Sequence, residues 1–222
     1  MFSKFFKKIN DEAFSSIDLI HQCLIDEVRT NAFKKAIEES MRSGDVVLDA
    51  GTGSGILAFF AAKAGAKKVV ISAPVSEDGD GVNTYLLGVN ADKYKGEEVI
   101  SNSSCTTNCV APVAAIMHSK FGILKAMMTT THAYTQDQNL QDGPHKDLRR
   151  ARGAAQNIVP TSTGAAISTT HVIPELEGLF DGTAMRVPVA VGSISDFTFL
   201  LKKKVTVEEV NNAFKVASEN PL

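Results

Sequence analysis

A chain of 222 residues is long enough for one or two domains, and a hydrophobic fraction of 44% is sufficient for a core. The formal net charge of -2 excludes a strongly basic surface, so it provides no basis for binding nucleic acid or an anionic membrane. No apolar run reaches the length of a transmembrane helix, and the three cysteines do not form an even disulfide set, which indicates a reducing compartment such as the cytoplasm.

Helical periodicity dominates the start of the chain. Residues 1–10 mix lysines with phenylalanines and are predicted to form an amphipathic helix, with contact to a membrane surface as the alternative. Residues 15–44 are also predicted to be helical, ending at Gly44. Their apolar side chains recur at helical spacing: Ile17, Ile20, Leu24, Val28, Phe33, Ala36, Ile37 and Met41.

A strand, a glycine-rich turn and a helix follow. Residues 45–49 are predicted to form a short buried strand, residues 51–55 the turn, and residues 56–66 the helix. This order is typical of the start of a doubly wound, Rossmann-like nucleotide-binding sheet. We therefore expect a partial Rossmann-like α/β unit over residues 1–100.

The glycine turn has the pattern Asp-x-Gly-x-Gly-x-Gly, which differs from the dinucleotide fingerprint because only one residue separates its last two glycines. With DEVRT before it and AAKAGAKKVV after it, the segment 16–70 resembles class I S-adenosylmethionine-dependent methyltransferases of the protein arginine branch and its small prokaryotic relatives. The resemblance implies S-adenosylmethionine as a cofactor. It places the methionine part beside Gly51 and Gly53, with Gly55 in the same turn and Asp49 positioning the loop.

The methyltransferase resemblance ends at the next strand, residues 67–71. In that family an acidic residue follows this strand and binds the ribose hydroxyls, but here the strand is followed by Ser72-Ala73-Pro74. A methyltransferase-like module that binds S-adenosylmethionine stays open as one interpretation.

A cysteine in a small polar segment, SNSSCTTNC, precedes the next helical pattern. Cys105 is predicted to lie at or just before the helix N-terminus, where the helix dipole favours a thiolate, and Pro112 is predicted to lie in the first turn. A strand-like segment then leads to His132, which could act as the base for Cys105. The alternative is that Cys105 is a small buried hydrophobic residue. A metal site with Cys109 is not expected, because no second cysteine pair exists.

From about residue 71 to residue 222, the chain resembles glyceraldehyde-3-phosphate dehydrogenase. The motifs that carry the resemblance are SNSSCTTNC, TTTHAYT, DLRRARGAAQNIVPTSTGAA and MRVPVAVGSISD. The resemblance implies an α+β catalytic domain with a mostly antiparallel sheet over residues 101–222, incomplete at its C-terminus. It also implies a homo-oligomer, or association through exposed faces, and NAD or NADP as the cofactor.

The dehydrogenase resemblance also implies roles for individual residues. Cys105 would attack the aldehyde of glyceraldehyde 3-phosphate, His132 would take the proton and assist hydride departure, and inorganic phosphate would open the thioester. Substrate-binding positions are Thr135 and Arg186 for the substrate's phosphate, and Ser104, Thr106, Thr163 and Gly164 for the attacking phosphate. Ser72 and Ala73 match residues that line the cofactor pocket. Residues 149–157 match a loop near the cofactor and the subunit interface, whereas His21, His118, His145 and His171 are expected to be surface or capping groups.

The change of family falls at about residues 66–70, within the segment AGAKKVV that fits both resemblances. We therefore interpret the chain as a fusion of two unrelated sequences joined at a shared segment. The dehydrogenase part lacks its own dinucleotide-binding unit, so open sheet edges and exposed apolar faces are expected. A capping box, Thr206-Val207-Glu208-Glu209, predicts one more helix. A non-catalytic fragment that associates with an intact dehydrogenase is the remaining interpretation.

Overall fold

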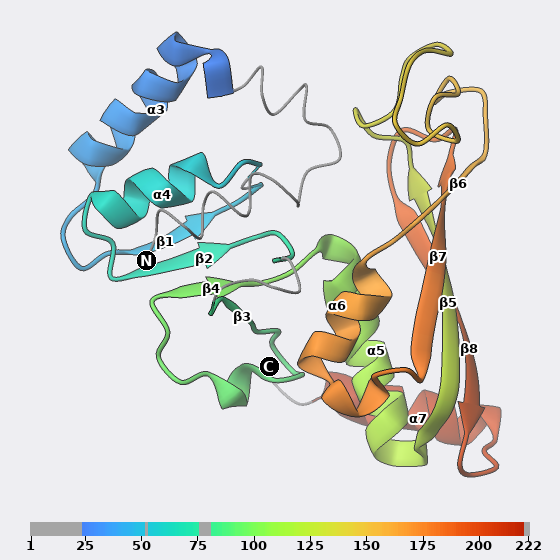
Figure 1. Cartoon of the computed structure of the whole chain (residues 1–222). Helices are drawn as coiled ribbons and strands as arrows, with labels where there is room; N and C mark the ends of the chain where they lie inside the picture. Colours follow the sequence, from blue (N-terminus) through green and yellow to red (C-terminus); the bar gives the residue numbers. More distant parts are fainter. Residues whose placement is uncertain (1–23, 52, 76–80, 220–222) are drawn as a thin grey trace. The chain divides into compact units, whose positions relative to one another are not determined.

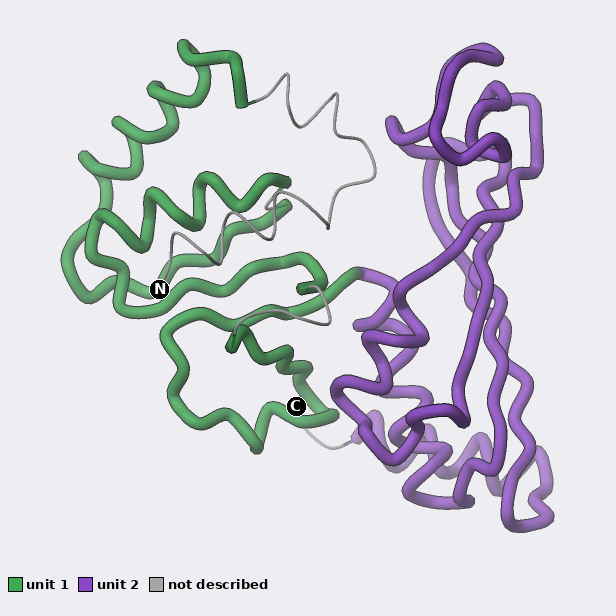
Figure 2. The backbone as a smooth tube through the Cα atoms, in the orientation of Figure 1, with its two compact units in different colours: residues 1–104 green, residues 105–222 purple. Residues whose placement is uncertain are grey.

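The computed structural model describes residues 24–51, 53–75 and 81–219 (Figure 1). The helix predicted over residues 1–10, the start of the helix predicted over residues 15–44, Cys23 and His21 lie outside these residues. The chain divides into two compact units, residues 1–104 (unit 1) and residues 105–222 (unit 2), coloured separately in Figure 2. Within the described part of the chain, no helix combines the length and the apolar character needed to cross a membrane.

Unit 1 contains a four-stranded parallel sheet. Its strands are β1 (Val46–Asp49), β2 (Lys68–Ile71), β4 (Val99–Ser101) and β3 (Asn83–Thr84), in the order β1-β2-β4-β3. Its helices are α3 (Glu27–Ser40), α4 (Ile56–Lys63) and the short 3-10 helix η1 (Ala91–Lys93). The core forms where small residues of α4 pack on alternate residues of β2: Ala58, Ala61, Val69 and Ile71.

The sheet of unit 1 joins the two parts of the sequence. Strand β1 lies in the methyltransferase-like segment and pairs with β2, which in turn pairs with β4 of the dehydrogenase-like segment. The hydrogen bonds that tie Asn102 to Ile71 and Ser72 to Asp49 extend this pairing beyond the strand ends. Both parts therefore contribute strands to one continuous sheet.

Three predictions for unit 1 were wrong in detail. The continuous helix over residues 15–44 is interrupted at Asp26, which has non-helical backbone angles and whose carboxylate accepts the N–H of Arg29 as an N-cap. Helix α3 then ends at Ser40 and buries no residue; Val28 is 84% exposed. Strand β1 is not buried either, because it forms the edge of the sheet and leaves Val46 and Leu48 each 65% exposed.

Unit 2 contains a mixed four-stranded sheet in the order β6-β7-β5-β8. Its strands are β5 (Ile123–Ala133), β6 (Val159–Thr161), β7 (Phe180–Val187) and β8 (Ser193–Leu201). Only β5 and β7 are parallel; the other two pairs are antiparallel. Figure 1 shows helices α5 (Cys105–Phe121) and α6 (Ala165–Val172) beside this sheet. The 3-10 helix η2 (Pro174–Leu176) and helix α7 (Val207–Ser218) complete the unit. The parallel sheet of unit 1 and the mostly antiparallel sheet of unit 2 confirm the predicted fold class.

Alternation along β5 separates the two faces of the sheet in unit 2. From Ala126 on, buried and exposed residues alternate, with Ala126 and Met128 buried and Met127 exposed, whereas an irregularity between Ile123 and Lys125 shifts the pattern at the start of the strand. A period of two residues is what a strand with one covered face requires. The exposed face is the kind of apolar surface expected from the sequence.

Helix α5 begins at Cys105, which confirms the predicted helix start. Pro112 lies inside the helix rather than in its first turn, so that prediction was wrong. Proline in this position cannot donate to the carbonyl four residues earlier. The capping box of α7 is confirmed, because the Thr206 hydroxyl accepts the N–H of Glu209 and the Glu209 carboxylate accepts the N–H of Thr206.

Candidate active site

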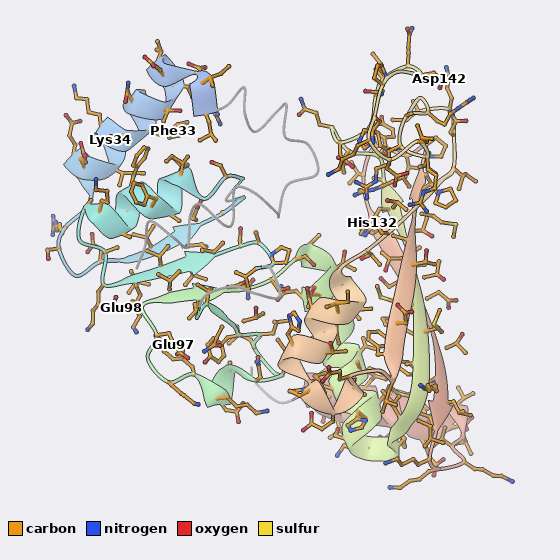
Figure 3. The ribbon with its side chains drawn as sticks, in the orientation of Figure 1. Phe33, Lys34, Glu97, Glu98, His132 and Asp142 are labelled. Carbon is orange, nitrogen blue, oxygen red and sulfur yellow. The ribbon has the colours of Figure 1, made fainter. Side chains whose placement is uncertain are left out.

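The candidate site of unit 2 is built at the carboxyl ends of two parallel strands. His132 near the end of β5 lies opposite Arg186 near the end of β7 in the strand register. Arg186 Nη1 also donates to the carbonyl oxygen of Ala133 at 3.2 Å. Figure 3 shows His132 toward one end of the sheet, near the loop region that carries Asp142. Because parallel strands end on the same edge, an imidazole and a guanidinium meet there.

Thr106 connects this edge to the start of helix α5. Its Oγ1 lies 3.1 Å from His132 Nε2 and 4.0 Å from Cys105 Sγ. Thr106 is only 8% exposed, whereas Cys105 is exposed as a free thiol. Among the described residues there is no direct hydrogen bond between Cys105 and His132; the Thr106 hydroxyl lies between them.

Electrostatics keep the imidazole of His132 uncharged at pH 7. Burial lowers the pKa of His132 below its usual 6.5, and the positive charge of Arg186 lowers it further. Burial is also the main cause that lowers the pKa of Arg186, followed by the charge of Arg150; the charges of Asp137 and Cys105 act in the opposite direction. His132 is therefore available as a proton acceptor, and Arg186 lies within electrostatic reach of Cys105.

A second group of polar side chains adjoins Arg186 and was not predicted from the sequence. Arg150 forms an ion pair with Asp137 and donates from Nε to the Thr161 hydroxyl at 2.7 Å. His145 Nε2 lies 3.7 Å from Asp137 Oδ1, and the His145 side chain is only 11% exposed. Its Nδ1 accepts the N–H of Asp147 at 2.9 Å, so of the two predicted roles, surface or capping group, His145 has the capping role. These residues lie on a loop and a strand, where no periodic spacing signals that they meet.

Three buried polar atoms in this region have no hydrogen-bond partner among the described residues. They are Asp137 Oδ1, Gln138 Nε2 and Arg186 Nε. Buried polar atoms in folded proteins are nearly always bonded, so each such atom requires an explanation. A polar ligand held at this edge of the sheet would supply the missing partners.

Three other positions implied by the dehydrogenase resemblance, Thr135, Thr163 and Gly164, lie in loops that adjoin β5 and α6. Thr135 follows β5 and its N–H donates to Gln138 Oε1 at 3.4 Å. Thr163 and Gly164 precede α6, where the Thr163 hydroxyl accepts the N–H of Ala165 at 3.2 Å. In the described part of the chain, none of these three residues is hydrogen bonded to the imidazole or the guanidinium. Ser104 is the last residue of unit 1.

In unit 1, the glycine turn is closed by contacts within the protein. Gly51 N donates to the Ser72 hydroxyl at 2.7 Å, and Asp49 Oδ2 accepts the N–H of Ala58 at 3.1 Å in the first turn of α4. The backbone φ angles of Gly51, Gly53 and Gly55 are +74°, +52° and +75°, a region that disfavours other residues. Ala73 contributes its carbonyl oxygen, which accepts the Ser101 hydroxyl.

These contacts test whether a nucleotide cofactor fits unit 1. A dinucleotide places its diphosphate against free amides at a helix N-terminus. Here the carboxylate of Asp49, only 6% exposed, occupies that position and would repel the diphosphate. The turn therefore does not fit NAD. For S-adenosylmethionine the glycine geometry is present, but Ser72 stands where a ribose-binding carboxylate is needed and its hydroxyl already accepts the Gly51 amide.

Comparison with known proteins gives two family matches. Residues 104–222 match the family model for the C-terminal domain of glyceraldehyde 3-phosphate dehydrogenase, and residues 30–78 match the one for ribosomal protein L11 methyltransferase (PrmA). These matches confirm both resemblances and define unit 2 as a dehydrogenase C-terminal domain. The chain belongs to the glyceraldehyde-3-phosphate dehydrogenase family.

Curated relatives with the name glyceraldehyde-3-phosphate dehydrogenase are similar to most of this chain. The protein of Mycolicibacterium smegmatis is 60% identical over 160 residues, which cover 72% of this chain and 46% of that protein. The protein of Mycobacterium tuberculosis is 59% identical over the same length, with the same coverage. Glyceraldehyde-3-phosphate dehydrogenase 2 of Streptomyces avermitilis is 57% identical over 160 residues, covering 71% of this chain and 47% of that protein. The chain spans about half the length of these relatives.

Proposed function

We propose that unit 2 performs the thiol step of the family's reaction on glyceraldehyde 3-phosphate. The Cys105 sulfur adds to the aldehyde carbon, a C–S bond forms and the carbonyl π bond opens. The thiol proton passes to His132 and is returned to the new alkoxide, so the product is a thiohemiacetal. The step needs no oxidant. The observation that supports it is the uncharged imidazole of His132, joined through the Thr106 hydroxyl to the start of the helix that carries Cys105.

Anion recognition in this proposal follows the family match. Arg186 and Thr135 hold the substrate's phosphate. The resemblance assigns Ser104, Thr106, Thr163 and Gly164 to inorganic phosphate, which would act only on a thioester and therefore only after hydride transfer. The half-buried guanidinium of Arg186, with an Nε that has no partner among the described residues, suits such an oxygen. The backbone N–H of Cys105 and the His132 side chain would stabilise the oxyanion.

The family resemblance names NAD or NADP as the hydride acceptor, with Ser72 and Ala73 lining its pocket. In this chain both residues are engaged within unit 1, and the carboxylate of Asp49 opposes the diphosphate. The proposed activity of the chain therefore ends at the thiohemiacetal and does not include hydride transfer. A cytoplasmic location is part of the proposal because the free thiol of Cys105 must stay reduced.

Competition between two cysteines of one helix tests the proposal. Cys109 lies four residues after Cys105 on α5 and is also exposed, and within the described residues no imidazole is hydrogen bonded to it. A free thiol is only a few per cent ionised at pH 7, so proton removal could accelerate alkylation by at most about 30-fold. A thiolate that forms more readily is also a weaker nucleophile, so part of this gain in rate is lost. We therefore expect Cys105 to react with iodoacetamide about tenfold faster than Cys109.

Peptide mass spectrometry after timed alkylation gives both rates in one sample. Glyceraldehyde 3-phosphate should protect Cys105, whereas glycerol 3-phosphate, which has the same phosphate but no carbonyl, should protect it less. His132→Gln should remove the advantage of Cys105. Equal rates for the two cysteines, with no protection by the aldehyde, would refute the proposal.

S-adenosylmethionine is the second candidate ligand, favoured by the match of residues 30–78 and by the left-handed glycines of the turn. Binding would be weak because Ser72 cannot replace the ribose-binding carboxylate. Isothermal titration of the full chain with S-adenosylmethionine tests this candidate, and the absence of heat at millimolar concentration would reject it.

Association with further subunits is also part of the proposal. The exposed face of the sheet in unit 2 carries large apolar side chains: Leu124, Met127, Ile194 and Leu200. Such a surface suits a second copy of the chain or an intact relative. Sedimentation of the pure chain, and co-purification with an intact relative, distinguish the two.

A further inference from the structure

The sheet of unit 1 is covered on one face by helices. Side chains alternate between the two faces along each strand, and the buried residues of β1, β2 and β4 all lie on the face of α4: Asp49, Val69, Ile71 and Ser101. Ile37 of α3 packs against the same core, so α3 and α4 lie on one side of the sheet (Figure 1). On the opposite face, no described residue of these strands is buried.

This opposite face, called here the open face, carries a row of apolar side chains. Leu48, Val70 and Ile100 lie in register across three strands. Val46 extends the row along β1, and Val46 and Leu48 are each 65% exposed. Parallel sheets are normally covered on both faces. An apolar row on the second face therefore requires a cover.

We propose that residues 2–9 of the same chain fold into a helix that packs on the open face. Four apolar side chains of this segment recur at helical spacing: Phe2, Phe5, Phe6 and Ile9. At 3.6 residues per turn they fall within an arc of about 100°, and the lysines of the segment fall on the other side of the helix. Such a helix buries its phenylalanines on the row and keeps its lysines in water.

The dimensions of the segment match those of the row. Three neighbouring strands measure about 10 Å across, and strands of three or four residues are about 10–13 Å long. A helix over residues 2–9 is about 12 Å long and about 10 Å wide with its side chains. The other segments outside the described residues that could pack here, 76–80 and 220–222, are too short for such a helix.

The connection to α3 favours this segment over a second copy of the chain. Residues 10–23 join it to α3, and α3 leads into β1 at the edge of the sheet. When extended, these residues reach about 45 Å, more than twice the length of α3, which is about 21 Å. A segment tethered in this way acts at an effective concentration of about millimolar. At micromolar chain it therefore outcompetes a second molecule.

Hydrogen exchange of β1 in the full chain tests the proposal. Phe5→Gln combined with Phe6→Gln removes apolar contacts of the segment and keeps its lysines. Lys7→Gln combined with Lys8→Gln is the matched control on its other side. We expect the first double variant to speed exchange of the β1 amides about tenfold, because the apolar area of Leu48 loses its cover, and the control to leave it unchanged.

A tryptophan in the segment locates the contact directly. The chain contains no tryptophan, so Phe6→Trp introduces a single fluorescent reporter. Acrylamide should quench it weakly, and adding Leu48→Gln should raise the quenching toward that of free tryptophan. Leu140→Gln is the matched control, because Leu140 is 83% exposed and belongs to unit 2.

The outcomes decide between the possible occupants. Equal exchange in the two double variants, or quenching that Leu48→Gln does not change, would overturn the proposal. Protection of β1 that decreases on dilution would show that a second copy covers the open face, and would overturn it as well. If the phenylalanine variant also speeds exchange of β5 in unit 2, it has disturbed the whole chain, and the quenching of Phe6→Trp with and without Leu48→Gln decides.

Discussion

Gly182 provides the most specific test of how the sheet of unit 2 supports its candidate site. It lies on β7 opposite Met128 of β5, and the same two strands bring His132 and Arg186 together further along. A Cβ at Gly182 would lie 2.5 Å from Met128 Cγ, 3.1 Å from its Cε and 3.1 Å from its carbonyl oxygen. Met128 is almost fully buried, so Gly182→Ala should force the two strands apart.

Two opposing terms set the size of the effect. Overpacking a core costs about 1–3 kcal/mol. Because Gly182 is not among the glycines with positive φ, alanine also gains about 0.4–1 kcal/mol by restricting the unfolded chain. We expect a net loss of about 1–2 kcal/mol in the opening free energy of strand β5, measured by hydrogen exchange of its peptides. A change below about 0.5 kcal/mol would refute the reasoning, because it would mean that Met128 moves away without cost.

A double variant with Met128→Ala is the matched control. Met128→Ala alone should cost about 2–5 kcal/mol by leaving a cavity. In the double variant the new methyl group of Gly182→Ala enters this space, so the combined loss should be smaller than the sum of the two single losses by about 1 kcal/mol or more. Additive losses would show that the two side chains do not compete for space.

Three further predictions concern single groups. Arg186→Met should raise the pKa of His132 only part of the way to 6.5, because burial lowers this pKa more than the charge of Arg186 does. NMR titration of the imidazole C–H measures the shift, and an unchanged pKa would contradict an effect of the cation. Thr206→Ala should cost about 1 kcal/mol of helix α7 stability and Thr206→Ser much less, as measured by hydrogen exchange; equal losses would contradict a cap. The pKa of Glu97 is lowered to about 2, mainly by the hydrogen bond from Tyr85. The contribution of Glu97 to stability should therefore be present above pH 4.5 and lost as the pH falls toward 2. Glu97→Gln should remove this acid dependence, as measured by local hydrogen exchange.

The elements that could be predicted are those with local signals. Helix α5 starts at Cys105, within the small polar segment that precedes the apolar helical spacing, and α7 starts where Thr206 and Glu209 cap each other. Strand β5 was predicted as a strand-like segment that leads to His132. Each of these signals is contained within a few neighbouring residues.

The parts that could not be predicted depend on partners distant in the sequence. The meeting of His132 with Arg186 requires the parallel pairing of β5 and β7, which no local pattern encodes. The same holds for the ion pair of Arg150 with Asp137. Strand β1 was predicted as buried from its apolar residues, but its position at the sheet edge decides exposure, and that position is a property of the whole sheet.

The continuous sheet of unit 1 determines how the chain can be divided. Two fused domains are usually joined by a linker that a protease can cut. Here the change of family falls at strand β2, which is hydrogen bonded to β1 on one side and to β4 on the other. Removing the residues that precede the shared segment 64–70 would deprive β2 of its partner β1 and of the apolar contacts with Ala58 and Ala61 of α4. A crossover inside a strand preserves the ladder of the sheet, whereas the loops on either side can differ freely. In unit 1, the strand at which the two resemblances meet thus holds both segments in one sheet.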